Sequence, residues 1–131
     1  MKWKYSCPHC KAVLNPHVKI VLSARRGKTH GLVLLSPRPG NYQFLCDDEF
    51  RAKVKEGELI TLSCPSCGAD LTSTVSKKLA EVNLHQPGRQ VMKVQFSRVQ
   101  GEQATFILNG ETVVPYGEDA DLYDEVNFFG V

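Results

Sequence analysis

The sequence predicts a mainly β fold made of two halves, each a cysteine knuckle followed by a β-meander. One four-cysteine metal site joins the halves, and helices are short at most. Three observations lead to this expectation. Two Cys-x-x-Cys couples, Cys7–Cys10 and Cys64–Cys67, occur in one chain of 131 residues. Short alternating apolar runs are separated by turns rich in Gly, Pro and Asn. Several positions of the first half recur in the second.

The spacing of the two couples suits a metal ion. A tetrahedral zinc ion lies about 2.3 Å from each sulfur and takes two thiolates from one tight turn, which two intervening residues can form. Pro8 and Pro65 follow the first cysteine of each couple and restrict the backbone of that turn. We therefore expect a closed structural zinc site, with iron as the alternative ion. Its four ligands would be Cys7, Cys10, Cys64 and Cys67.

Both couples resemble the knuckles of zinc ribbons and rubredoxin-like domains, which read Cys-Pro-x-Cys followed by Gly. Gly68 completes this pattern in the second couple, whereas Lys11 stands there in the first, where we expect a looser turn. The resemblance covers only these residues. Residues 11–63 separate the couples, far more than in an ordinary ribbon, so we expect a small domain between them.

The first couple also matches another family. Cys7-Pro8-His9-Cys10 is similar to the active-site tetrad of DsbA-type thiol oxidases, which implies thiol–disulfide exchange through Cys7 and Cys10. Only six residues precede Cys7, too few for the strand and helix that lead into the tetrad in that family. Pro16 also interrupts any helix that begins at Cys10. We keep thiol oxidoreductase as the second alternative function.

In the first half, the apolar pattern predicts a short strand at 3–6 and a half-buried strand at 18–23. Residues 25–30 read as a basic hairpin loop. The continuously apolar run 31–36 predicts a central strand, and 37–40 is a turn by composition.

The fifth cysteine falls in the next predicted strand. Tyr42, Phe44 and Cys46 share one face of that strand, so we expect Cys46 to be a buried apolar residue. Residues 47–55 predict a short helix capped by an aspartate, and 58–63 predict the strand that leads into the second couple.

In the second half, strands are expected at 81–84, 92–96 and 104–108. Asn109-Gly110 predicts a type I′ hairpin into a further strand at 112–114. In the acidic tail, the spacing of Leu122, Val126 and Phe129 indicates a short amphipathic helix. We expect it to pack on the protein's own sheet, with insertion into a partner's groove as the alternative.

An internal echo supports two similar halves. Ser6, Cys7, Cys10, Ala12 and Leu14 recur 57 positions later as Ser63, Cys64, Cys67, Ala69 and Leu71. Ser36 and Gly40 recur 61 positions later as Ser97 and Gly101. We therefore expect one domain, 1–131, with pseudo-repeats at about 1–57 and 58–116 and an acidic tail at 117–131.

The charge is polarised although the chain's net charge is only +2. Residues 1–55 contain eleven Lys or Arg and three acids, whereas the remainder contains five Lys or Arg and eleven acids. The basic half could face an anionic partner. Its candidate contacts for an anion or a nucleic acid are Arg25, Arg26, Lys28 and Arg38.

The sequence shows no catalytic motif, so we expect a non-enzymatic module. The first function we expect is a zinc-binding protein-interaction or assembly module. The alternative is a nucleic-acid-binding, zinc-ribbon-like module that uses the Arg25–Lys28 loop. No apolar segment follows the first lysines and no run is long enough to span a membrane, so we expect a cytoplasmic protein without a membrane partner.

Overall fold

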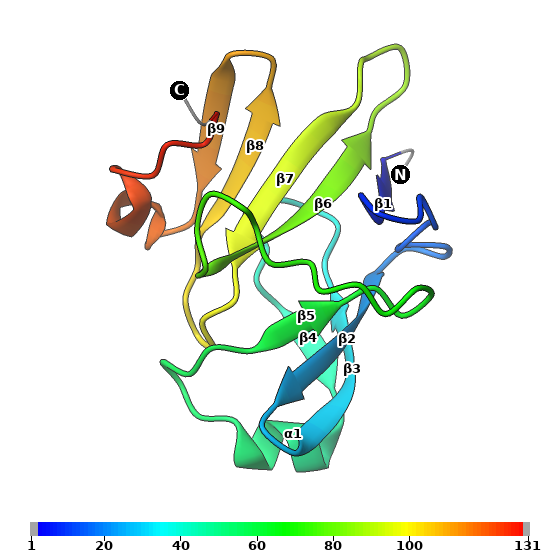
Figure 1. The fold of residues 1–131 in the computed structure, drawn as a ribbon, viewed down its shortest axis with the longest axis vertical. Coiled ribbons are helices and arrows are strands. Elements are labelled where there is room, and N and C mark those ends of the chain that lie inside the picture. The colour runs from blue at the N-terminus through cyan, green and yellow to red at the C-terminus, as the bar shows by residue number, and fades with distance from the viewer. Residues whose placement is uncertain (1–2, 130–131) are drawn as a thin grey trace.

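The computed structural model describes residues 3–129 as two antiparallel sheets (Figure 1). One sheet has five strands in the order β1-β6-β7-β8-β9, and the other has four in the order β4-β3-β2-β5. The strands are β1 (Lys4–Ser6), β2 (Ile20–Arg26), β3 (Thr29–Leu35), β4 (Phe44–Cys46), β5 (Thr61–Ser63), β6 (Leu79–His85), β7 (Met92–Ser97), β8 (Thr105–Asn109) and β9 (Thr112–Tyr116). The helical elements are α1 (Asp48–Lys53) and the 3-10 turn η1 (Ala120–Tyr123). The predicted mainly β fold with short helices is confirmed.

The two sheets repeat each other's pairing, and each takes its first strand from the other half of the chain. β1 pairs with β6, and β5 pairs with β2. Tyr5 in β1 pairs with Leu84 in β6. The equivalent residues of the other sheet also pair: Leu62, which lies 57 positions after Tyr5, pairs with Ala24, which lies 60 positions before Leu84. The strand that enters each knuckle therefore completes the sheet of the opposite half.

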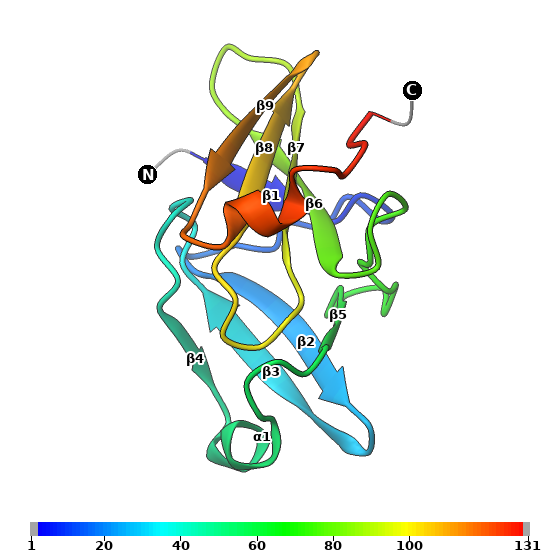
Figure 2. The same cartoon turned by 90° about the vertical axis from the view of Figure 1, so that its left-hand side faces the viewer.

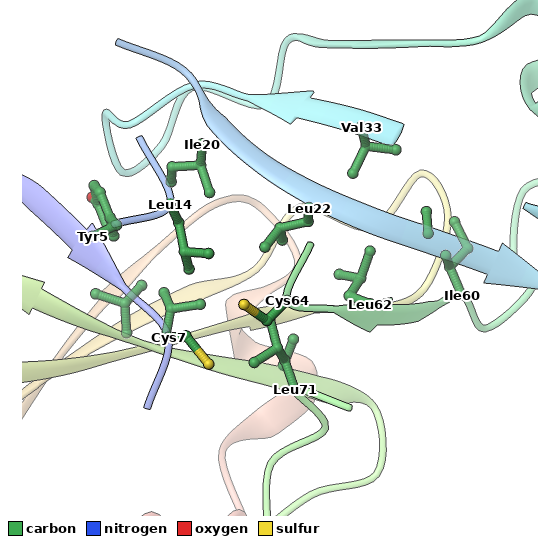
Figure 3. Close-up of a cluster of buried hydrophobic side chains, with 14 of the residues drawn as sticks. Tyr5, Cys7, Leu14, Ile20, Leu22, Val33, Ile60, Leu62, Cys64 and Leu71 are labelled. Carbon is green, nitrogen blue, oxygen red and sulfur yellow. The ribbon is translucent and has the colours of Figure 1, made fainter. Parts of the chain in front are cut away.

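The main core lies between the inner faces of the two sheets. Leu22, Val82 and Leu84 are completely excluded from solvent there. Figure 3 shows Cys7 and Cys64 within this cluster, beside Leu71. Because both knuckles begin inside the core, the packing of the two sheets fixes where the four sulfur atoms lie.

The C-terminal segment packs on the outer face of the five-stranded sheet, as expected, but not as the predicted helix. Only η1 is helical; Leu122 is 71% exposed and Phe129 is 41% exposed. The rings of Tyr123 and Phe128 instead contact Phe106, with centroid distances of 5.6 and 4.8 Å. The helical period was the wrong guide because the chain leaves helical geometry after one short turn.

The β8–β9 hairpin differs from the predicted type I′ turn by one residue. Asn109 pairs with Thr112 inside the ladder, which leaves Gly110 and Glu111 as the loop. Gly110 has a φ of 62°, and Glu111 is not among the residues with positive φ, a pattern typical of type II′. The β2–β3 hairpin has the same form at Gly27 and Lys28, so the predicted basic loop is only two residues long.

No helix within residues 3–129 is long and apolar enough to cross a bilayer.

Candidate metal centre

The two knuckles have the same backbone structure. The N–H of Lys11 donates to the carbonyl of Cys7 at 3.0 Å, and the N–H of Gly68 donates to that of Cys64 at 2.9 Å. Lys11 has a φ of 67° and Gly68 one of 76°. The expectation of a looser first turn is therefore wrong. Lys11 adopts the left-handed conformation that glycine takes more easily, because the knuckle requires it.

The knuckles bring the four sulfur atoms together. The Sγ atoms of Cys7 and Cys67 are 3.9 Å apart, and those of Cys10 and Cys64 are 3.7 Å apart. All four lie within 4.8 Å of one another. Sulfur atoms about 2.3 Å from one tetrahedral ion would be separated by about 3.8 Å, whereas a disulfide would bring two of them to about 2.05 Å. All five cysteines are free thiols, and the cluster has the dimensions of a four-thiolate metal site.

Backbone amides support the charge that such a site carries. The N–H of His9 donates to Cys7 Sγ at 3.3 Å, and the N–H of Ser66 donates to Cys64 Sγ at 3.4 Å. These bonds stabilise a thiolate and orient its sulfur. His9 itself is exposed. Each knuckle contributes one buried cysteine, Cys7 or Cys64, and one exposed cysteine.

The electrostatics of the cluster favour a bound cation. At Cys67 a hydrogen bond from the backbone of Ala69 lowers the thiol pKa, but burial and the neighbouring thiols outweigh it and raise the pKa to about 11. The Cys67 thiol, beside three other thiols, thus resists becoming a thiolate. A metal ion removes this resistance because it stabilises each thiolate directly, and binding would release protons.

The donor set fits zinc or iron and indicates a structural role. Four thiolates fill the coordination of a tetrahedral ion, so no position is left for water or a substrate. Sulfur ligands alone do not select between the two metals. Within residues 3–129, no other group of three or more His, Cys, Asp or Glu side chains is arranged to hold an ion.

The four predicted anion contacts are not brought together. Arg25, Arg26 and Lys28 lie at the β2–β3 hairpin, whereas Arg38 follows the other end of β3. The seven residues of β3 span about 20 Å at about 3.3 Å per residue, so Arg38 belongs to a different surface. Arg26 is also paired with Glu58, with an N–O distance of 2.8 Å.

The sequence did not reveal a cavity of about 380 Å³ between the inner faces of the sheets. Cys46 lines it and is half-buried beside Phe44, which agrees with the predicted face but not with full burial. Two equivalent turns border the cavity: the N–H of Arg38 donates to Ser36 Oγ at 3.2 Å, and that of Val99 donates to Ser97 Oγ at 3.0 Å. The repeated Ser and Gly residues were the available signal for these turns.

The surroundings of the first couple differ from those of a thiol oxidase. Cys7–Cys10 forms a turn directly after β1, rather than the start of a helix. Cys7 lies 3.9 Å from Cys67 Sγ, a partner from the other half of the chain. No family model, curated protein or solved structure significantly matches the chain.

Proposed function

We propose that this protein is a non-enzymatic zinc-binding β module that acts in protein interaction or assembly. The four-sulfur cluster is the observation on which the proposal rests, because it could hold one structural ion between two halves of a small chain. Structural zinc contributes about 10–16 kcal/mol in small peptides, comparable with the whole stability of a domain of this size, about 5–15 kcal/mol. The ion would therefore hold a binding surface in shape rather than react.

The interaction role is supported by what the structure leaves uncovered. Several large apolar side chains on the surface are more than half exposed, including Val18, Leu32, Leu45 and Leu122. Leu32 and Leu45 belong to the same sheet. A metal-held scaffold with an apolar surface is typical of binding modules.

The metal is tested by elemental analysis of the protein purified without added metal, combined with a thiol count after denaturation in a chelator. We expect one zinc per chain and five reactive thiols. A visible absorption band with iron in place of zinc would change the ion but keep the site. Absence of any bound metal, or two protons fewer per chain from a disulfide, would contradict the proposal.

The interaction role is tested by affinity capture with the zinc-loaded protein and with Cys64→Ser. Partners that are recovered with wild type and lost with Cys64→Ser support a surface that the metal maintains. Cys46→Ser is the matched control, since it also replaces a cysteine but lies outside the cluster.

Nucleic-acid binding is the second candidate, supported by the exposed side chains of Arg25 and Lys28 at the hairpin. It predicts affinity for short DNA or RNA that falls steeply with salt. The proximity of Glu58 to Arg26 leaves fewer free cations there than the sequence suggests.

A further inference from the structure

The outer face of one sheet is covered by the chain, whereas that of the other sheet is not, although the two sheets have equivalent strand pairings. Leu34 pairs with Leu45 in the β3–β4 ladder, and Gln95 pairs with Phe106 in the β7–β8 ladder. Both residues of the second pair lie 61 positions after those of the first. Phe106 is therefore the counterpart of Leu45, and the covering of one face shows what the other lacks.

The face around Phe106 is covered by the chain itself. Tyr123 and Phe128 pack on its ring, and Phe106 is only 4% exposed. Figure 2 shows the C-terminal segment crossing this sheet. The outer edge of β8 is also covered, because β9 pairs along its full length.

The counterpart face is bare. Leu45 is 54% exposed and Leu32 is 51% exposed, and with the half-buried Leu34 they form what we call the outer leucine face. β4 is paired only by β3 and ends its sheet, since the chain continues into α1 where β8 continues into β9 (Figure 2). An apolar face beside an open strand edge exposes both apolar surface and backbone hydrogen-bonding groups, although in β4 the Phe44 carbonyl already accepts a hydrogen bond from Arg51 at 3.5 Å.

A shorter connection also contributes to this exposure. In the first half, the N–H of Val21 donates to the carbonyl of Leu14, and in the second half the N–H of Glu81 donates to the carbonyl of Leu71. The segment between the two bonded residues, which connects the knuckle to the next strand, is therefore three residues longer in the second half. The longer connection places Ser73 Oγ 2.9 Å from Gln95, which is 1% exposed. Its counterpart, Leu34, has no such cover and is only half-buried.

Charge indicates the nature of the occupant. The segment that covers the five-stranded sheet, residues 117–129, contains five acids and no Lys or Arg. Residues 20–63, which contain the four strands of the bare sheet, include seven Lys or Arg and five acids. The shallow hollow next to Leu32 contains the exposed Arg25 together with Asp47 and Asp70. The bare sheet therefore has a net charge of +2 and the covering segment one of −5, so an acidic segment is attracted to this face whereas a second copy is not.

We propose that the outer leucine face and the free edge of β4 bind an extended acidic segment with aromatic side chains from a protein partner. The segment adds a strand beside β4, as β9 does beside β8, and places aromatic rings on Leu45, as Tyr123 and Phe128 do on Phe106. This inference rests on the proposed interaction function and names the surface that performs it.

The test uses the full zinc-loaded protein and a fluorescein-labelled synthetic peptide with the sequence of residues 111–129. We expect saturable binding by anisotropy, and roughly tenfold weaker binding or none to Leu45→Glu and to Leu32→Glu. Val91→Glu is the matched control, because Val91 is also 54% exposed but lies outside this sheet. A peptide with alanine in place of Tyr123 and Phe128 should bind much more weakly. Thermal melts confirm that each variant is folded.

Three results overturn the inference. The first is that the peptide fails to bind wild type. The second is that it binds Leu45→Glu as well as it binds wild type, as it would if it replaced the chain's own tail on the five-stranded sheet. The third is that wild type forms dimers that Leu45→Glu abolishes, which makes a second copy the occupant. If captured partners remain bound to Leu45→Glu but are lost with Cys64→Ser, the proposed function stands and only this surface is ruled out. If wild type captures no partner at all, the proposed function itself is contradicted.

Discussion

Replacing Cys64 by serine is the sharpest test of the metal centre. Cys64 is 1% exposed, and it contributes one of two thiolates from the second half of the chain. Serine keeps the shape of cysteine but supplies a poor ligand for zinc, so the cross-link between the halves weakens. We expect zinc content to fall and the free energy of unfolding to drop.

The size of the drop follows from the segment that the ion closes. Cys7 and Cys64 are 57 positions apart. Treated as a covalent cross-link, closure of a segment of that length stabilises the folded chain by about 4 kcal/mol through the unfolded-state entropy. For a chain of this size that corresponds to a Tm lower by about 12–20 °C. The metal–thiolate bonds add to this value.

The assay is thermal unfolding followed by far-UV circular dichroism, with zinc measured in the same samples. Cys46→Ser is the control, because Cys46 is a half-buried free thiol outside the cluster and its replacement should change Tm by only a few degrees. Chelation should lower the Tm of wild type toward that of Cys64→Ser. Equal Tm values for the two variants, with zinc retained in both, would refute the metal assignment.

Three further predictions test the periphery. Burial raises the pKa values of Tyr5, Tyr42 and Tyr123, the last to about 12. These phenols therefore stabilise the fold fully below about pH 10 and lose that contribution as the pH rises through their folded pKa values. Alkaline titration at 295 nm should show delayed ionisation of tyrosine that disappears in denaturant. Phe128→Ala should destabilise the protein by about 1–3 kcal/mol in urea denaturation, because the ring loses its contact with Phe106, while an unchanged midpoint would show that the tail does not stabilise the sheet. Arg25→Glu should weaken any salt-dependent binding of single-stranded DNA in an anisotropy titration, and no effect would exclude the hairpin as its contact.

The sequence predicted the strands well because alternation and turn residues are local signals. β7 at Met92–Ser97 and β3 at Thr29–Leu35 lie close to their predicted ranges. For the tail it predicted the contact of Val126 correctly and those of Leu122 and Phe129 wrongly, because the chain makes one 3-10 turn and then packs Phe128 on Phe106. That outcome depends on a tertiary contact that no local pattern records.

The ligand set was predictable, but the way in which the ligands meet was not. The spacing of the couples Cys7–Cys10 and Cys64–Cys67 is enough to predict four thiolate ligands. Their convergence depends on β1 and β5 each joining the sheet of the other half, a long-range pairing. The candidate cations failed to converge for a similar reason: Arg38 is close to Arg25 in sequence, yet β3 separates them in space.

The exchange of β1 and β5 explains why a metal is useful at this position. Each is only three residues long, at the edge of its sheet, and its pairing alone is a weak connection between the halves. The knuckle follows immediately, so an ion that binds both knuckles holds the ends of both exchanged strands at once. Separation of the halves would then require the loss of the ion and of two strand pairings together. We therefore expect the zinc-loaded protein to unfold in one cooperative step, and a separate early loss of one sheet would show that the exchange does not couple them.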